Sequence, residues 1–215
     1  MSNLVLQYDI GFYLDPDRFL KRMHIDGENE ADRNARACVP ELLELAEKIT
    51  KIYAYCFRGH GEDSVMVRQA DCCREQWVCL CHLGPEILDR AQSFMEEGEY
   101  LKGYLLSEMA NDILFHVSSE LDRLVEENCL ERGMYLTRKY YPGDPGIPIE
   151  TLQHYLDLLK RGLEPGTLQV RVSSGGMLIP EKAILYVMGA DPDNRRISQD
   201  HDCSKCSKVN CAFRI

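Results

Sequence analysis

The chain has 215 residues, of which 45% are hydrophobic, and its formal net charge is −10. Its length allows one sizeable core, and its acidic balance argues against a nucleic-acid backbone as the main partner. The N-terminal segment lacks a basic start and an apolar run of signal length, and no apolar stretch approaches the roughly 20 residues that span a bilayer. We therefore expect a cytoplasmic protein with reduced cysteines and without nucleic-acid or membrane partners.

The first half of the chain predicts alternating strands and helices. Asp15 followed by Pro16 is a helix start signal, because the aspartate caps the helix and proline fits its first turn. Apolar residues from Leu42 to Ile49 then form one face of a second helix. Strands are expected at residues 4–12, 52–57, 65–67 and 77–83, and helices at residues 16–23, 31–51 and 85–94.

The longest helical pattern runs from Glu99 to Cys129 and ends before Gly133, a good helix stop. Apolar residues repeat every four positions along it: Leu101, Leu105, Met109, Ile113, Val117, Leu121 and Val125. This spacing places them on one face, which predicts a seam against the core. We interpret His116 and Cys129 on this helix as packed or surface residues rather than ligands.

The second half predicts shorter elements and an α+β class, with long helices packed on a modest, mainly antiparallel twisted sheet. We expect a main domain at residues 1–192 and a cysteine-rich tail at residues 193–215. Strands are expected at residues 134–137, 168–172, 177–179 and 183–187, with a helix at residues 149–159.

Residues 140–148 hold three prolines and two glycines in nine positions, so they cannot form regular structure. Gly143 and Gly146 allow a ligand to approach the backbone closely, and the prolines hold the shape of the loop. Aromatic faces and positive charges for a ligand carboxylate come from Tyr140, Tyr141, Arg138 and Lys139. This loop is the best pocket candidate in the body of the chain, and a purely structural strand-to-helix turn is the alternative.

Other chemical motifs are weak or missing. Residues 173–177, Ser-Ser-Gly-Gly-Met, resemble a phosphate loop only superficially and fit a tight hairpin turn better. The sequence contains no Walker motif, no nucleophile elbow, no His-Glu-x-x-His and no dinucleotide-binding glycine fingerprint. Motifs therefore give no support to nucleotide hydrolysis, hydrolase chemistry or a nicotinamide cofactor.

Three of the ten cysteines lie near the C-terminus, at Cys203, Cys206 and Cys211. Three thiols at this spacing can converge on an iron–sulfur cluster or a zinc ion, and free thiols are the alternative. A fourth ligand would be His201, solvent or a cysteine of a second group. That second group is otherwise interpreted as small buried residues, and it comprises Cys72, Cys73, Cys79 and Cys81.

In sequence order, these segments resemble the activation-domain family of vitamin B12-dependent methionine synthase, especially its free-standing members. The resemblance covers residues 5–192 and includes Ile10-Gly-Phe-Tyr-Leu-Asp-Pro, Leu83-Gly-Pro-Glu-Ile-Leu and Met177-Leu-Ile-Pro-Glu-Lys. Its centre is Lys139-Tyr-Tyr-Pro-Gly-Asp144, which is similar to the family motif Arg-x-x-Pro-Gly-Tyr. Lys139 stands at the arginine position unless Arg138 takes that role, and Asp144 replaces the tyrosine.

The resemblance implies an S-adenosylmethionine-binding protein that assists reductive methylation of cobalamin on a partner methyltransferase or other corrinoid-binding protein. The implied ligand-binding residues are Arg138, Lys139, Tyr141, Pro142, Gly143 and Asp144. The alternative is a non-catalytic corrinoid-protein partner, or an iron–sulfur or zinc adaptor, that kept the fold and lost the ligand. We further hypothesise that the cysteine tail holds a cluster that relays the electron of the reductive step.

Overall fold

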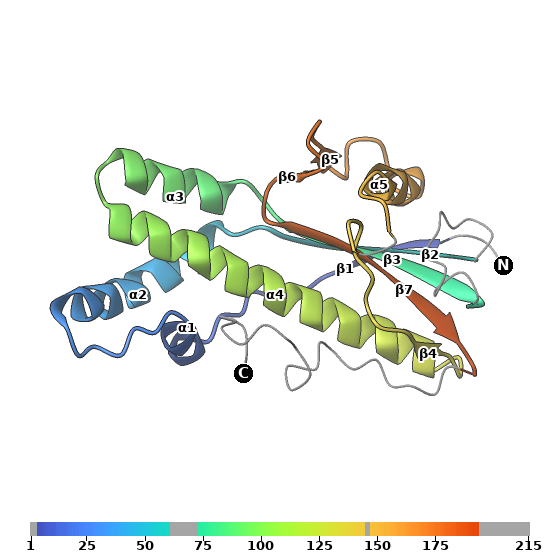
Figure 1. The fold of residues 1–215 in the computed structure, drawn as a ribbon, viewed down its shortest axis with the longest axis horizontal. Helices are drawn as coiled ribbons and strands as arrows, with labels where there is room; N and C mark the ends of the chain where they lie inside the picture. The colour runs from blue at the N-terminus through green and yellow to red at the C-terminus, as the bar shows by residue number, and fades with distance from the viewer. Residues whose placement is uncertain (1–3, 61–72, 145–146, 194–215) are drawn as a thin grey trace. The chain divides into compact units, whose positions relative to one another are not determined.

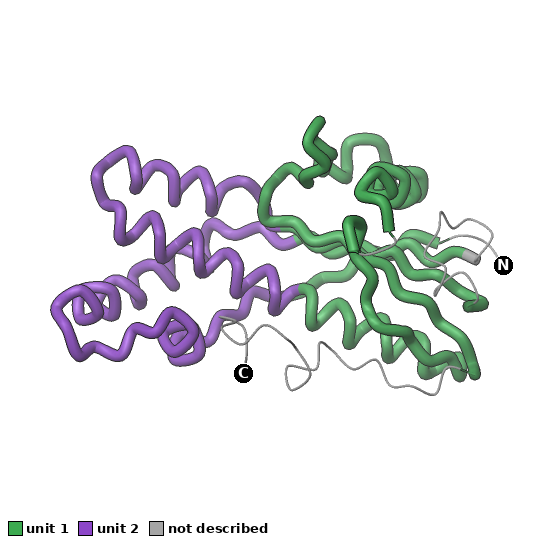
Figure 2. Tube along the Cα trace, in the orientation of Figure 1, with its two compact units in different colours: residues 1–10, 53–82, 118–200 green, residues 11–52, 83–117, 201–215 purple. Residues whose placement is uncertain are grey.

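The computed structural model describes residues 4–60, 73–144 and 147–193. These residues belong to two compact units, coloured separately in Figure 2. Unit 1 takes in residues 1–10, 53–82 and 118–200, and unit 2 takes in residues 11–52, 83–117 and 201–215. The expected strand at 65–67, Cys72 and the three tail cysteines lie outside the described residues.

The described part of unit 2 consists mainly of helices. It contains α1 (Pro16–Arg22), α2 (Glu30–Ile49), α3 (Glu86–Glu96) and the part of α4 (Tyr100–Leu130) that ends at Val117 (Figure 1). The expected cap at α1 is confirmed, because the Asp15 carboxylate accepts hydrogen bonds from the backbone N–H groups of Asp17 and Arg18. The four-residue repeat of α4 is confirmed too, and its apolar face is buried along most of the helix.

Two kinds of contact hold the helices of unit 2 together. The Arg22 guanidinium joins α1 to α4, because it lies 3.0 Å from Glu108 Oε2 and 2.7 Å from Asp112 Oδ1. Helices α3 and α4 approach closely at Gly103, where an added Cβ would lie 2.7 Å from the carbonyl oxygen of Ala91. A side chain at position 103 would therefore force the two helices apart.

Unit 1 is built around a five-stranded sheet in the order β1-β2-β3-β7-β4. Its strands are β1 (Leu4–Tyr8), β2 (Ile52–His60), β3 (Glu75–Leu83), β4 (Tyr135–Leu136) and β7 (Ala183–Asp191). Strands β1 and β2, β3 and β7, and β4 and β7 pair antiparallel. Helix α5 (Thr151–Arg161) lies on one side of this sheet, and residues 118–130 of α4 lie on the other (Figure 1). The expected α+β class is confirmed.

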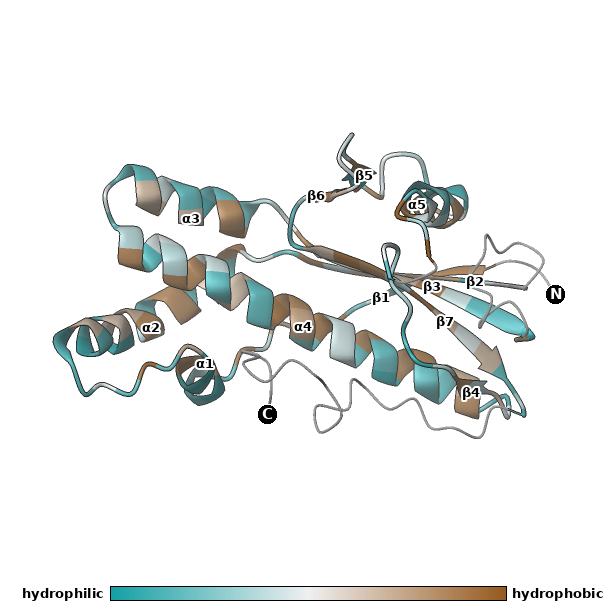
Figure 3. Cartoon of the chain, in the orientation of Figure 1, coloured by the Kyte–Doolittle hydropathy of each residue, from teal (hydrophilic) through white to brown (hydrophobic). Residues whose placement is uncertain are grey.

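The two faces of the sheet differ in their side chains. The face toward α5, the α5 face, contains Val78 and Leu80 in a large apolar cluster with α5. The opposite α4 face holds the alternate residues of β3, Trp77, Cys79 and Cys81, all fully buried. In Figure 3, α4 alternates between hydrophobic and hydrophilic colours along its length, as a helix with one buried side should.

Several boundaries differ from the sequence expectation. Strand β1 ends at Tyr8, which pairs with Ala54 near the start of β2, so few partner residues are left for a longer strand. Strand β7 is longer than expected, because β3 pairs with it as far as Ala190 and β4 pairs with Ala190 and Asp191. The expected strand at 168–172 shortens to β5 (Arg171–Val172), which pairs with β6 (Leu178–Ile179) in a separate hairpin.

Candidate functional site

The proline and glycine loop is fixed to the sheet at its root. Tyr140 exchanges two backbone hydrogen bonds with Val187 of β7, both at 2.9 Å. Its ring is buried in the cluster on the α5 face, and the Thr137 hydroxyl accepts a 2.9 Å hydrogen bond from the N–H of Gly189. The residues that follow Tyr140 therefore leave a rigid strand at a defined point.

A short turn closed by Asp144 follows this root. The Tyr141 N–H donates to Asp144 Oδ2 at 3.0 Å, and the Asp144 N–H donates to the Tyr141 carbonyl at 2.9 Å. Gly143 has a φ of +98°, a left-handed conformation that favours glycine. Asp144, the residue at the tyrosine position of the family motif, thus uses one carboxylate oxygen to hold the loop itself.

The two glycine loops singled out in the sequence both approach Ile149. An added Cβ would lie 3.4 Å from Ile149 Cδ1 at Gly143 and 3.0 Å from Ile149 Cγ1 at Gly176. The expected hairpin turn at 173–177 is confirmed, with the Gly176 N–H donating to the Ser173 carbonyl at 3.0 Å. Ile149 and Met177 are 41% and 60% exposed, so apolar surface gathers around these turns.

Lys139 is directed toward α4 rather than along the loop. Its ammonium forms an ion pair with Asp122 and lies 3.3 Å from the Ser118 hydroxyl. The same nitrogen lies 4.7 Å from the centre of the Tyr186 ring. We call Ser118, Asp122, Lys139 and Tyr186 the Lys139 network. The other three members carry no local signal in the sequence, because they lie on α4 and β7, far from Lys139 along the chain.

Asp122 links the two sides of this network. Its Oδ1 accepts a 2.6 Å hydrogen bond from the Tyr186 hydroxyl, while its Oδ2 faces Lys139. Burial raises the pKa of Tyr186 well above its usual value, and the nearby thiols and the Asp122 carboxylate raise it further. Tyr186 therefore remains a neutral donor, and its ring lies 6.0 Å from the ring of Tyr141 in a tilted arrangement.

Arg138 and Lys139 occupy different surroundings although they are neighbours in sequence. Arg138 is exposed, and its guanidinium lies 4.7 Å from the centre of the Tyr140 ring. The side chain of Lys139 is only 17% exposed. Arg138 is thus the more accessible cation at the loop, and Tyr141, at 38% exposure, is the more accessible ring.

The expected burial of the second cysteine group is confirmed where the structure describes it. Cys73, Cys79 and Cys81 are buried, and Cys79 Sγ lies 3.3 Å from Cys56 Sγ on the neighbouring strand. Burial raises the pKa of the Cys56 and Cys81 thiols well above the usual value. No group of three or more potential metal ligands comes together among the described residues, and the tail cysteines are outside that set.

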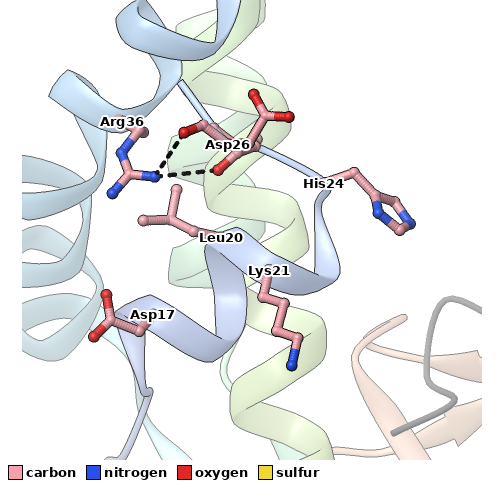
Figure 4. Close-up of a pocket in the computed structure, with 7 residues that line it drawn as sticks. Asp17, Leu20, Lys21, His24, Asp26 and Arg36 are labelled. Atoms are coloured by element: carbon pink, nitrogen blue, oxygen red, sulfur yellow. Dashed lines mark hydrogen bonds between the residues drawn. The ribbon is translucent and has the colours of Figure 1, made fainter. Parts of the chain in front are cut away.

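A cleft of about 370 Å³ lies in unit 2 (Figure 4). Arg36 Nη1 closes one side of it by donating to the backbone carbonyls of Ile25 and Asp26 at 3.4 and 3.3 Å. His24 has a φ of +55° at the end of α1, where its N–H and that of Ile25 complete a helix-ending turn. The cleft is lined by Asp17, Leu20, Lys21, His24, Ile25, Asp26 and Arg36. This lining contains both acidic and basic side chains, and it includes none of the site residues expected from the sequence.

Comparison with known proteins identifies a similar fold but no matching sequence family. No family model and no curated protein matches the chain. Among solved structures, the chain is similar to the MetH reactivation domain bound to AdoHcy, with a TM-score of 0.61 and 10% sequence identity over 90% of this chain and 80% of that one. The likeness establishes the fold expected from the sequence resemblance. No helix among the described residues is long and apolar enough to cross a membrane.

Proposed function

We propose that this chain binds S-adenosylmethionine at residues 138–144 and assists reductive methylation of a corrinoid on a partner methyltransferase. The observation that carries the proposal is the fold likeness to a reactivation domain whose crystal structure contains AdoHcy, the demethylated form of this ligand. The second support is the loop, where an exposed cation, an exposed ring and a left-handed glycine follow one another on a root fixed to β7.

The proposed roles follow from the accessibility of each side chain. Arg138 would bind the ligand carboxylate through its guanidinium fork, which suits a planar anion better than an ammonium does. Tyr141 would offer its ring to the adenine, and the backbone at Pro142 and Gly143 would approach the ligand closely. Asp144 would shape the turn. The protein would thus position two reactants, while the corrinoid on the partner accepts the methyl group.

The alternative function, a corrinoid-protein partner that has lost the ligand, also has support. Asp122 already neutralises Lys139, and Asp144 already has a hydrogen bond within its own turn. Both residues of the motif that depart from the family pattern therefore have partners inside the protein. Ligand binding by the purified protein separates this alternative from the main proposal.

The deciding experiment is a calorimetric titration of S-adenosylmethionine into anaerobically purified protein. We expect saturable one-to-one binding at micromolar strength, about −8 kcal/mol. Arg138→Ala should weaken it about tenfold, as loss of one charge-assisted hydrogen bond predicts, whereas Arg161→Ala, at an exposed arginine of α5, should leave it unchanged. No heat at several temperatures would contradict the main proposal and favour the non-catalytic partner.

A separate part of the proposed function concerns metal binding by the tail cysteines. Cys203, Cys206 and Cys211 would hold an iron–sulfur cluster or zinc, and a cluster there would relay the electron for the reductive step. Iron, sulfide and zinc analysis of anaerobically purified protein tests the binding. Cys206→Ala should lower the metal content and slow reductive activation of the corrinoid partner, and undiminished activation would count against the relay.

A further inference from the structure

The proposed ligand and the proposed loop create an electrostatic conflict. S-adenosylmethionine has a permanent sulfonium cation besides its ammonium and carboxylate groups, whereas S-adenosylhomocysteine has a neutral thioether instead. Two consecutive cations, Arg138 and Lys139, stand at the start of the loop. One of them can meet the ligand carboxylate, but a second uncompensated cation would disfavour the sulfonium and so favour the demethylated ligand.

Asp122 on α4 compensates the charge of Lys139 and so removes this conflict. It reaches Lys139 from α4, and the two side chains are 19% and 17% exposed, so water screens the pair less than it would on an open surface. The hydrogen bond from the Tyr186 hydroxyl fixes the other carboxylate oxygen at 2.6 Å. Since both oxygens are held, the negative charge has a defined position next to the lysine.

The network also has a physical connection to the exposed part of the site. The Lys139 ammonium and the Tyr141 ring both lie against the ring of Tyr186, at 4.7 Å and 6.0 Å between the relevant centres. Tyr186 is fully buried in β7, so this arrangement rests on the sheet rather than on the loop. The net charge of the Lys139 network therefore lies close to the Tyr141 ring, which the ligand would contact.

We infer that Asp122 is a specificity-determining residue that neutralises Lys139 and thereby sets the preference of this site for the sulfonium ligand over its thioether product. The inference rests on the proposed function, because it assumes that the loop binds S-adenosylmethionine. Asp122 acts through Lys139 as a positioning residue and does not contact the ligand. Because the site would bind the sulfonium ligand more tightly than the thioether, the thioether product would dissociate more readily after methyl transfer.

The test compares the dissociation constants of S-adenosylmethionine and S-adenosylhomocysteine by calorimetry for wild type and variants. Asp122→Asn keeps the shape and a hydrogen-bond acceptor but removes the charge. It should lower the preference for the sulfonium ligand about tenfold, the effect of one unit charge at roughly 10 Å in an effective dielectric of about 20. Lys139→Met should shift the preference in the opposite direction, because it leaves the negative charge uncompensated.

Two further variants separate specificity from simple damage. The double variant Asp122→Asn with Lys139→Met should return the preference to near the wild-type value, because both charges are absent. Glu120→Gln, on the same helix and paired with Arg123 at 3.0 Å, should leave the preference unchanged. Thermal melts of each variant verify folding, and the lysine variant tests the inference should Asp122→Asn fail to fold.

The possible outcomes are distinct. Opposite shifts in the two single variants support the inference. If both ligands weaken equally in Asp122→Asn and the preference of Lys139→Met equals that of wild type, Asp122 has only a structural role and the inference is wrong, while the proposed function stands. If wild-type protein binds neither ligand, the proposed function fails and the inference fails with it.

Discussion

The two faces of the sheet in unit 1 use the same strands for different purposes. On the α5 face, Val78 and Leu80 pack into a large apolar cluster that excludes water. On the α4 face, Cys79, Cys81 and Tyr186 lie beside a partly buried ion pair. Side chains alternate along a strand, so a shift of one residue moves a side chain from the apolar α5 face to the α4 face with its ion pair.

The loop after β4 continues this alternation. Tyr140 enters the cluster on the α5 face, while its neighbours Lys139 and Tyr141 contact Tyr186 of the α4 face. The anchoring residue and the candidate ligand-binding residues are thus separated by the geometry of an extended chain. The α5 face therefore anchors the loop by apolar packing, while the α4 face holds the polar groups.

The largest expected effect contrasts adjacent residues of β3. Leu80→Ala, on the α5 face, should lower the free energy of unfolding by about 3 kcal/mol, because it leaves a cavity in a packed cluster. Cys79→Ala, on the α4 face, should cost about 1 kcal/mol, since a thiol is small. Denaturant unfolding monitored by circular dichroism measures both, and equal losses would contradict the division of the two faces.

A second prediction concerns the Lys139 network. Asp122→Ala should lower the free energy of unfolding by about 2 kcal/mol, because it leaves a partly buried ammonium and the Tyr186 hydroxyl without their carboxylate. Asp122→Asn should cost less, since the amide oxygen still accepts from Tyr186. If the alanine variant unfolds like wild type, the network does not contribute to the stability of the α4 face.

The smallest expected effect depends on pH. Burial raises the pKa of the Cys129 thiol, on α4, from 9.0 to about 12. Above pH 9 the unfolded chain therefore loses this proton while the folded protein retains it, so stability falls as pH rises toward 12 and is fully present below pH 9. The loss from this one group should be about 1 kcal/mol at pH 9.5.

Cys129→Ala tests that prediction, because it should reduce the fall in unfolding free energy between pH 8 and pH 9.5. The packing control is Val125→Ala, one helical turn earlier on the same buried seam. It should lower stability at every pH and leave the slope unchanged. A slope that is equal in wild type and Cys129→Ala would mean that the folded protein gives up this proton as readily as the unfolded chain does.

Local signals in the sequence predicted much of the fold. The four-residue repeat of α4, the Asp15 cap and the turn at 173–177 are confirmed, because each depends on residues close together in the chain. The extent of β7 was not predicted, since its length depends on β3 and β4 as partners. Pairing between distant strands leaves little mark on local composition.

The candidate site was predictable only in its outline. The irregular loop followed from its prolines and glycines, whereas the left-handed conformation of Gly143 was seen only in the structure. The surroundings of Lys139 did not follow from the sequence, because nothing in the local sequence pattern distinguishes its partner Asp122 from the other acidic residues of α4. Direction is set by tertiary packing, so the choice between a ligand-facing and a helix-facing lysine needed the structure.

Trp77 is the single tryptophan of the sequence, and it is fully buried in unit 1 with the guanidinium groups of Arg58 and Arg132 5.9 and 5.7 Å from its ring. Its fluorescence is therefore a natural optical probe of the sheet alone. Emission should lie at short wavelength in the folded protein and move to longer wavelength once the α4 face opens. Circular dichroism, which is dominated by the helices of both units, can then be compared with it to establish whether the sheet and the helices unfold together.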